Sequence, residues 1–169
     1  RNRPTLLQTD YSKIGIGYFL SQKHCGCPGS APGCCQEGWR ITLAGSRFIK
    51  PAESRYSPIE GEALATAWAL EQTKYFTQGC PDLTVTTDHK PLLGIFGCPN
   101  MDQIDNQRLF SLKQKTLPWV FNIIHLPGKD NKFPDAVSRF PSTCEEQDNS
   151  EQSSLSMALS AIMINECTL

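Results

Sequence analysis

The sequence has no long apolar run. Its longest mainly apolar stretch, Leu155 to Ile164, has ten residues interrupted by serines, about half of the roughly 20 that a helix needs to cross a bilayer. Neither a membrane span nor a membrane partner is therefore expected. The sequence also lacks an initiator methionine and a charged-then-apolar leader, so we expect a piece of a longer polypeptide and not a secreted product.

The sequence has little net charge, −1 over 169 residues, but the charge is unevenly placed. Residues 1–140 hold all 16 Lys and Arg against 12 acids, whereas residues 141–169 hold five acids and no base. The second part is rich in Ser and Gln and has too little apolar area to offset chain entropy. We therefore expect one folded domain over 1–140, followed by an acidic Ser/Gln-rich tail or linker over 141–169. A net charge of +4 on the domain permits contact with nucleic acid without demanding it.

A secretory signal is missing although the chain has eight cysteines, so we expect reduced thiols in the cytosol or nucleus. Five potential zinc ligands crowd a Gly/Pro/Ser-rich stretch: His24, Cys25, Cys27, Cys34 and Cys35. Their spacing fits no paired C-x2-C framework. A variable hairpin loop is the favoured interpretation, and a zinc site is the alternative.

Alternating patterns predict strands and helices in an α/β order. The predicted strands are Thr5–Asp10, Ile14–Leu20, Trp39–Phe48, Leu83–Asp88 and Trp119–His125. The predicted helices are Ser57–Phe76, Pro91–Phe96, Gln103–Lys115 and Asn131–Arg139. A crossover in this order should make the first and fourth strands parallel neighbours.

Two acids end the strands that should be neighbours. Asp10 ends the first strand and Asp88 the fourth, each after a threonine. In a parallel pair these ends lie at the edge of the sheet where sites are usually built. Converging carboxylates repel unless a cation neutralises them, and oxygen ligands of this kind suit Mg²⁺ or Mn²⁺. Taken singly, either Asp could instead be a turn or helix cap.

Glu60 and Glu62 compete for a third position in this site. They are two residues apart, so on one helix they point about 200° away from each other. Ser57, Pro58 and Glu60 match a helix start in which Glu60 reaches back to the Ser57 backbone. Glu62 lies at the border of the apolar face that should pack on the sheet. We therefore assign the site role to Glu62.

Four ordered motifs resemble one family. The segments are LQTDYSKIGIGYFL, RYSPIEGEALATAWAL, VTTDHKPL and IIHLPGKDNKFPDAVSR. Together they resemble the ribonuclease H domain that follows the reverse transcriptase of gypsy-type LTR retrotransposons, over roughly residues 4–140. The resemblance implies a ribonuclease H-like α/β fold, with a five-stranded mixed sheet flanked by helices. It also implies four metal-binding acids, Asp10, Glu62, Asp88 and Asp135.

The resemblance implies a two-metal nuclease. Two Mg²⁺ ions, for which Mn²⁺ can substitute, would lie about 3.5 to 4 Å apart and clamp the scissile phosphate. By resemblance Asp10 bridges both ions, Glu62 and Asp88 complete one shell, and Asp135 completes the other. The substrate is an RNA–DNA hybrid, whose RNA strand is cut to leave a 5′-phosphate and a 3′-hydroxyl during reverse transcription.

The remaining expectations concern substrate contacts and context. His125 ends the last predicted strand, where it is either a surface hydrogen-bonder or a proton-transfer group, because histidine ordinarily changes charge near neutral pH. Candidate contacts to the hybrid are Ser12, Lys13, Lys90, Lys129, Lys132 and Arg139. No Tyr-x-Asp-Asp polymerase motif occurs, so we expect an upstream reverse transcriptase domain and a downstream integrase as partners in one Pol polyprotein. Cytoplasmic virus-like particles, or the nucleus, are the expected location.

Three alternatives stay open at this point. A domesticated, inactive domain could act as a connector, although all four acids are present. An integrase or transposase of the same superfamily would have its third acid on a late helix, whereas Glu62 lies between Asp10 and Asp88 in the sequence. A zinc-binding interaction protein would use the cysteine cluster.

Overall fold

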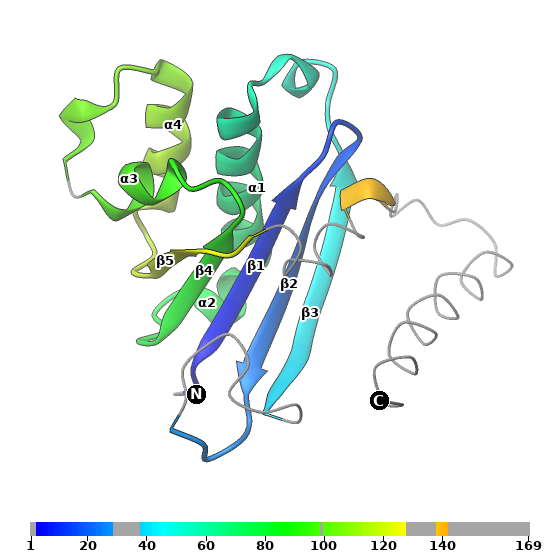
Figure 1. Ribbon diagram of the computed structural model, residues 1–169, viewed down its shortest axis with the longest axis vertical. Helices are drawn as coiled ribbons and strands as arrows, with labels where there is room; N and C mark the ends of the chain where they lie inside the picture. The colour runs from blue at the N-terminus through cyan, green and yellow to red at the C-terminus, as the bar shows by residue number, and fades with distance from the viewer. Residues whose placement is uncertain (1–2, 29–37, 99, 128–137, 142–169) are drawn as a thin grey trace, which may run out of the picture.

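The computed structural model describes residues 3–28, 38–98, 100–127 and 138–141. Figure 1 shows a sheet with helices packed against it. The strands are β1 (Thr5–Tyr11), β2 (Gly15–Lys23), β3 (Trp39–Phe48), β4 (Leu83–Thr87) and β5 (Asn122–His125). The helices are α1 (Pro58–Gln72), α2 (Lys74–Thr77), α3 (Leu92–Gly97) and α4 (Gln107–Thr116), with 3₁₀ turns η1 (Glu53–Arg55) and η2 (Met101–Gln103).

The five strands form one mixed sheet in the order β3-β2-β1-β4-β5. The central strand β1 is antiparallel to β2 and parallel to β4, and β5 adds to β4 in parallel. Gln8 of β1 lies opposite Thr86 of β4. The predicted five-stranded α/β fold and the parallel pairing of the first and fourth strands are therefore confirmed.

Helix α1 begins as the sequence predicts. Ser57 is its N-cap, Pro58 follows, and the Ser57 backbone N–H donates to Glu60 Oε2 at 2.8 Å. The helix ends at Gln72, not at Phe76 as predicted, and α2 continues after Thr73. The Thr73 hydroxyl donates to the Ala69 carbonyl at 2.7 Å, the kind of side-chain bond that competes with continued helix.

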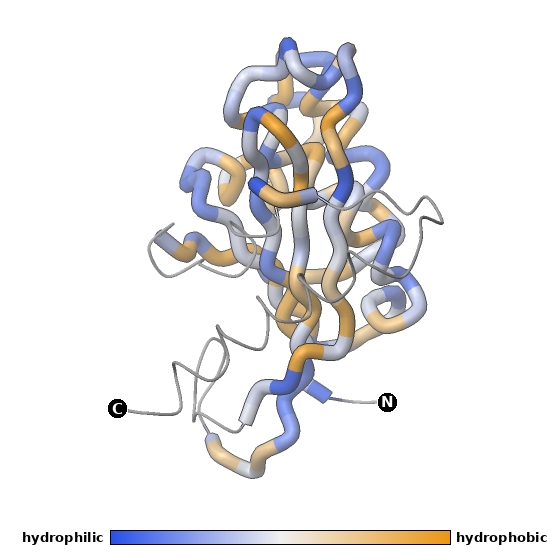
Figure 2. The backbone as a smooth tube through the Cα atoms, turned by 90° about the vertical axis from the view of Figure 1, so that its right-hand side faces the viewer, coloured by the Kyte–Doolittle hydropathy of each residue, from blue (hydrophilic) through white to orange (hydrophobic). Residues whose placement is uncertain are grey.

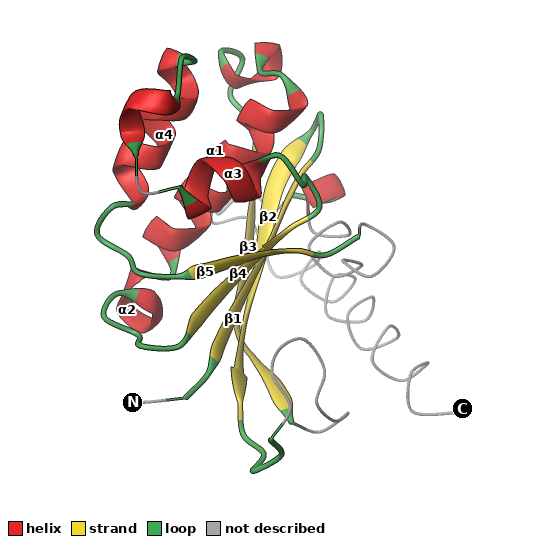
Figure 3. Ribbon diagram, turned by 60° about the vertical axis from the view of Figure 1, so that its left-hand side comes forward, coloured by secondary structure: helices red, strands yellow, loops and turns green. Residues whose placement is uncertain are grey.

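Helices gather on one side of the sheet, as Figure 3 shows. One apolar cluster lies between α1 and the central strands, with Leu7, Leu20, Leu70 and Val85 fully buried. A second cluster joins α1 to α3 and α4. Figure 2 shows hydrophobic stretches, in orange, alternating with hydrophilic ones along the backbone. None of the helices in the described ranges is long and apolar enough to cross a bilayer.

The last two predicted elements differ from the observed ones at their ends. The predicted strand Trp119–His125 is wrong in its first half, since β5 begins at Asn122. The Trp119 indole instead donates to the Thr77 hydroxyl at 3.0 Å, which ties this segment to α2. The predicted helix Asn131–Arg139 lies outside the described residues except for its end, where residues 138 and 139 are helical.

Candidate metal centre

Three carboxylates meet where β1, α1 and β4 come together. Asp10 lies near the end of β1, Glu62 near the start of α1, and Asp88 directly after β4. One oxygen of each lies within 4.8 Å of the others. The parallel register explains why Asp10 and Asp88 meet. Gln8 lies opposite Thr86, so the residues two positions further on, Asp10 and Asp88, lie at the same level. The sequence-based grouping of these three residues is reproduced by the fold.

Glu62 is buried to the same extent as Asp10, whereas Asp88 is partly exposed. The Glu62 side chain is buried, and its Oε1 accepts a hydrogen bond from the Tyr11 backbone N–H at 3.2 Å. Its Oε2 is buried and has no hydrogen-bond partner among the described residues. Burial raises the pKa of Glu62 well above its usual range, and the negative charges of Asp88 and Asp10 raise it further.

This donor set fits a divalent cation. A buried carboxylate oxygen without a donor is costly, and a bound cation supplies the missing partner. The three groups offer hard oxygen ligands, which suit Mg²⁺ or Mn²⁺ better than the nitrogen and sulfur ligands typical of zinc. Asp10, Glu62 and Asp88 are the residues that could hold it.

Ser138 is a contact that sequence reasoning missed. Its fully buried hydroxyl donates to Asp10 Oδ2 at 2.5 Å, across 128 positions of sequence. The residue lies in the PDAVSR motif, but its own identity gives no signal, because a serine near a short helix is more often a local cap.

Tyr11 and Gly61 pack against each other where the first turn of α1 meets the end of β1. A Cβ at position 61 would collide with the Tyr11 ring, so only glycine lets helix and ring approach this closely. Burial raises the pKa of Tyr11, and the charges of Glu62 and Glu53 raise it further. The Tyr11 backbone N–H is the Glu62 donor, so this packing also orients Glu62.

His125 lies beside the centre at the end of β5. His125 pairs with Thr87 of β4 in the sheet, and its Nε2 bonds the backbone carbonyl of Asp88 at 3.1 Å. A carbonyl oxygen only accepts, so Nε2 is the donor and carries a proton. The side chain is exposed, which leaves the ring at the surface next to Asp88.

The other predicted site residues are exposed, partly buried or outside the described residues. Lys13, Lys90 and Arg139 are exposed around the centre. The Ser12 hydroxyl is within hydrogen-bond distance of the Ser138 carbonyl, at 2.8 Å, and of the Gly15 carbonyl, at 3.0 Å. Asp135, Lys129 and Lys132 lie outside the described residues, and their predicted roles stay predictions.

Only part of the predicted cysteine cluster is described. Cys25 and Cys27 are partly buried, and the His24 ring bonds the Arg3 guanidinium. Cys34 and Cys35 lie outside the described residues, so the zinc alternative stays untested. Within the described ranges, Asp10, Glu62 and Asp88 form the one group with metal-binding geometry.

Two solved structures that match this architecture are ribonucleases H. RNase H1 from the halophilic archaeon Halobacterium salinarum NRC-1 matches with a TM-score of 0.53 at 14% identity, over 82% of this chain and 96% of that chain. LC11-RNase H1, solved in complex with an RNA/DNA hybrid, gives a TM-score of 0.56 at 14% identity, over 81% and 95%. The fold is therefore ribonuclease H-like.

The family follows from the sequence match. A family model described as the RNase H-like domain found in reverse transcriptase matches residues 1–116. The chain belongs to this family, which confirms the resemblance inferred from the four motifs.

Its curated relatives are far longer polyproteins. The retrovirus-related Pol polyprotein from transposon opus of Drosophila melanogaster is 32% identical over 139 residues, which are 82% of this chain and 12% of that protein. The corresponding polyprotein from transposon gypsy of the same organism is 33% identical over 137 residues, 81% and 11%. The chain thus spans about an eighth of the length of these relatives.

Proposed function

We propose that this domain is a metal-dependent ribonuclease that cuts the RNA strand of RNA–DNA hybrids during reverse transcription. The observation that carries the proposal is the meeting of Asp10, Glu62 and Asp88 within 4.8 Å, with Glu62 Oε2 buried and without a donor. Family membership and the fold support the same activity.

Asp10, Glu62 and Asp88 would hold divalent cations, with Asp135 as a fourth ligand. Asp135 precedes Ser138 by three residues, and Ser138 bonds Asp10, which supports its inclusion. Two Mg²⁺ or Mn²⁺ ions, when bound, supply charge neutralisation, an acidified water and stabilisation of the leaving oxygen. In the overall hydrolysis water adds to phosphorus, the bond to the 3′ oxygen breaks, and that oxygen takes up a proton.

His125 is placed to take part in proton transfer. Its Nε2 bond to the Asp88 carbonyl holds the ring at the rim of the centre. In the neutral ring Nδ1 is then the nitrogen without a proton, so Nδ1 can accept a proton from a group approaching from solvent. We assign His125 this role, which also suits release of the charged product.

Substrate contacts are proposed for the exposed groups around the centre. Lys90 follows Asp88 by two residues, Lys13 lies in the turn after β1, and Arg139 follows Ser138. These cations would contact phosphates, which position a duplex without reading its sequence. Choice of the RNA strand needs a contact to the 2′-hydroxyl, which we assign to the turn of Tyr11, Ser12 and Lys13.

The polyprotein context is part of the proposal. We propose that a reverse transcriptase domain precedes this one and that an integrase follows it in the parent chain, which acts in cytoplasmic virus-like particles or the nucleus. The match to Pol polyproteins of which this chain covers 11–12% supports the first partner in particular.

The decisive experiment is cleavage of a hybrid with labelled RNA in Mg²⁺, by the wild type and by Asp88→Asn. Wild type should release fragments with 5′-phosphate ends, and Asp88→Asn should lose at least about a hundredfold in rate, as expected for loss of transition-state stabilisation of roughly 2.7 kcal/mol or more. Glu60→Gln is the matched control and should keep the activity. A folded wild type that leaves the hybrid intact in both Mg²⁺ and Mn²⁺ would favour the inactive connector instead.

A further inference from the structure

The segment of residues 138–141 is docked on the turn that follows β1. The Ser12 hydroxyl lies 2.8 Å from the Ser138 carbonyl, and it also accepts the backbone N–H of Gly15 at 3.0 Å. A Cβ on Gly15 would lie 2.8 Å from the Ser138 carbonyl oxygen and equally close to Pro141 Cγ. In Figure 1 this segment, in orange, lies beside the turn-side end of β2.

This docking brings one hydroxyl to the metal centre. The Ser138 hydroxyl donates to Asp10 Oδ2, so the docked segment contributes a direct hydrogen bond to one of the three acids. The serine side chain is fully buried and Asp10 is 5% exposed, so water does not compete for this bond. The bond is thus shielded from solvent.

We propose that Ser138 is a positioning residue for the metal centre. By occupying Asp10 Oδ2, its hydroxyl fixes the rotation of the Asp10 carboxylate and so sets how Asp10 shares cations with Glu62 and Asp88. This role rests on the proposed function. It also gives a function to the docking of residues 138–141 on the β1–β2 turn. The docked segment supplies the Ser138 hydroxyl, a neutral donor, to a site in which three carboxylates repel one another.

Removing such an outer partner typically weakens metal binding by about tenfold to a hundredfold. We therefore expect Ser138→Ala to weaken Mn²⁺ binding about tenfold in calorimetric titration of the whole chain. With hybrid substrate, kcat should fall about tenfold and KM should stay within twofold, because the Ser138 side chain is fully buried and offers no surface to the substrate. Ser138→Thr keeps the hydroxyl and should recover most of both losses.

The rise in Tm on adding Mn²⁺ separates positioning from simple stabilisation. A merely structural serine would lower Tm without changing the rise in Tm that Mn²⁺ produces, whereas a positioning serine reduces that rise. If Ser138→Ala does not fold, Ser138→Cys replaces it, because cysteine fills a similar volume with a much weaker donor. Ser54→Ala removes an exposed hydroxyl that bonds only the Pro51 carbonyl and should match the wild type.

The outcomes distinguish the two proposals. Wild-type binding and cleavage with an unaffected Ser138→Ala variant, within twofold in Mn²⁺ affinity and kcat, would overturn the role of Ser138 alone. A wild type that neither binds Mn²⁺ nor cuts the hybrid would overturn the proposed function and this role with it.

Discussion

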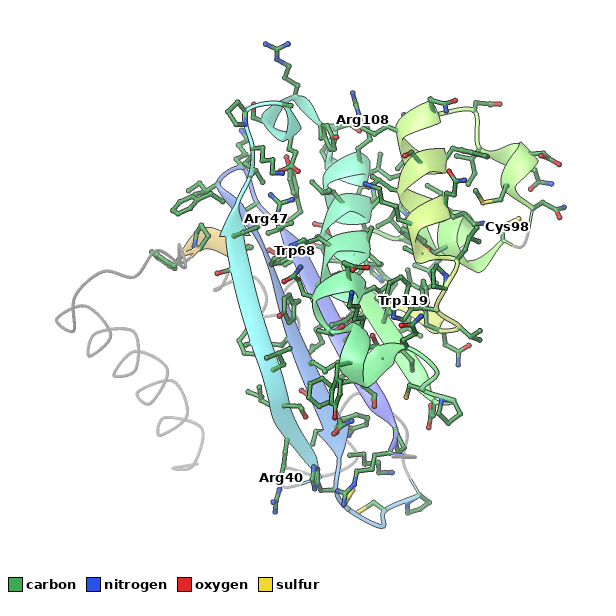
Figure 4. The ribbon with its side chains drawn as sticks, turned by 180° about the vertical axis from the view of Figure 1, so that it is seen from behind. Arg40, Arg47, Trp68, Cys98, Arg108 and Trp119 are labelled. Carbon is green, nitrogen blue, oxygen red and sulfur yellow. The ribbon has the colours of Figure 1, made fainter. Side chains whose placement is uncertain are left out.

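Glu60 and Glu62 are the same side chain in opposite surroundings. Burial alone would raise the pKa of Glu60, but hydrogen bonds from Ser57, Asn106 and Arg108 outweigh it and lower the pKa to about 2. Asn106 Nδ2 and Arg108 Nη1 each reach Glu60 Oε1 at 3.0 Å. Figure 4 shows Arg108 between α4 and the start of α1. Glu60 is thus a carboxylate with a structural role, held by hydrogen-bond donors, whereas Glu62 lies beside the negative charges of Asp10 and Asp88.

Glu62→Gln should therefore stabilise the metal-free protein. The change removes a buried carboxylate whose charge is opposed by burial and by Asp88 and Asp10. We expect a gain of roughly 1 kcal/mol at pH 8, or about 2–6 °C in Tm, together with loss of the rise in Tm on adding Mn²⁺. Differential scanning calorimetry with EDTA or Mn²⁺ checks both effects.

Glu60→Gln is the control for that experiment, since it makes the same chemical change two positions away. It should cost about 1.5–3 kcal/mol, because hydrogen bonds to a charged group are weakened, and it should leave the Mn²⁺ response intact. A metal-free Glu62→Gln protein that melts below wild type would contradict the account of Glu62.

Glu60 also predicts a pH dependence. Because its pKa is lower in the folded protein than the ordinary 4.5, its contribution is present above pH 4.5 and is lost as the pH falls toward about 2. Urea unfolding between pH 6 and pH 2 should show wild type losing more stability than Glu60→Gln in that window. Parallel curves for the two proteins would show that Glu60 is not the group responsible.

At this scale the sequence predicts the acids better than their partners. Asp10 and Asp88 follow from strand ends, and Glu62 follows from helix geometry once Glu60 is used as a cap. Ser138 could not be found in this way, because its significance depends on a contact with a residue 128 positions away. Local patterns carry no information about such a contact.

At the scale of elements, the start of α1 is held against β1 by Tyr11 and Gly61. Gly61→Ala places a methyl group in the Tyr11 ring, so it should cost about 1–3 kcal/mol through overpacking. Hybrid cleavage should fall as well, because the Tyr11 backbone orients Glu62. Thermal unfolding and initial cleavage rates measure the two effects.

Gly94→Ala in α3 is the matched substitution. A Cβ there meets nothing within 4 Å, so alanine should be neutral or stabilising by up to about 1 kcal/mol through its higher helix propensity. Cleavage should be unchanged. Equal losses in both variants would show that crowding at Tyr11 is not the cause.

Element ends were predicted less well than element types. The pattern before Phe76 is helical throughout, but α1 ends at Gln72 and α2 begins at Lys74; the Thr73 hydroxyl between them donates to the Ala69 carbonyl. The apolar run from Trp119 is typical of a strand, yet the Trp119 indole donates to the Thr77 hydroxyl of α2. In both places a side-chain hydrogen bond accompanies a boundary that apolar periodicity alone does not predict.

At the scale of the whole molecule, the small positive net charge of residues 1–140 limits the affinity for nucleic acid. Residues 1–140 carry 16 basic and 12 acidic side chains, so we expect weak binding of hybrid, with Kd of about 1–100 µM at physiological salt. Fluorescence anisotropy with Ca²⁺ in place of Mg²⁺ measures this without cleavage. Nanomolar affinity of residues 1–140 alone would contradict it and would make a neighbouring domain unnecessary for capture of the substrate.

The overall architecture was predictable because the hydrophobic patterns predict the element types, and the order of those elements restricts how the strands pair. The order of strands and helices predicts a parallel β1–β4 pair through the crossover rule, and the observed sheet contains this pair. The division at residue 140 stays a prediction, since residues 142–169 lie outside the described ranges.

The contact between Ser138 and Asp10 also has a consequence for biosynthesis. Because Asp10 comes early in the sequence and Ser138 128 positions later, a chain still emerging from the ribosome holds Asp10, Glu62 and Asp88 before it can complete the contact. Pairing across so many residues is also slow to form. We therefore expect the proposed ribonuclease activity to reach its full level only after Ser138 has been translated and has docked on Asp10.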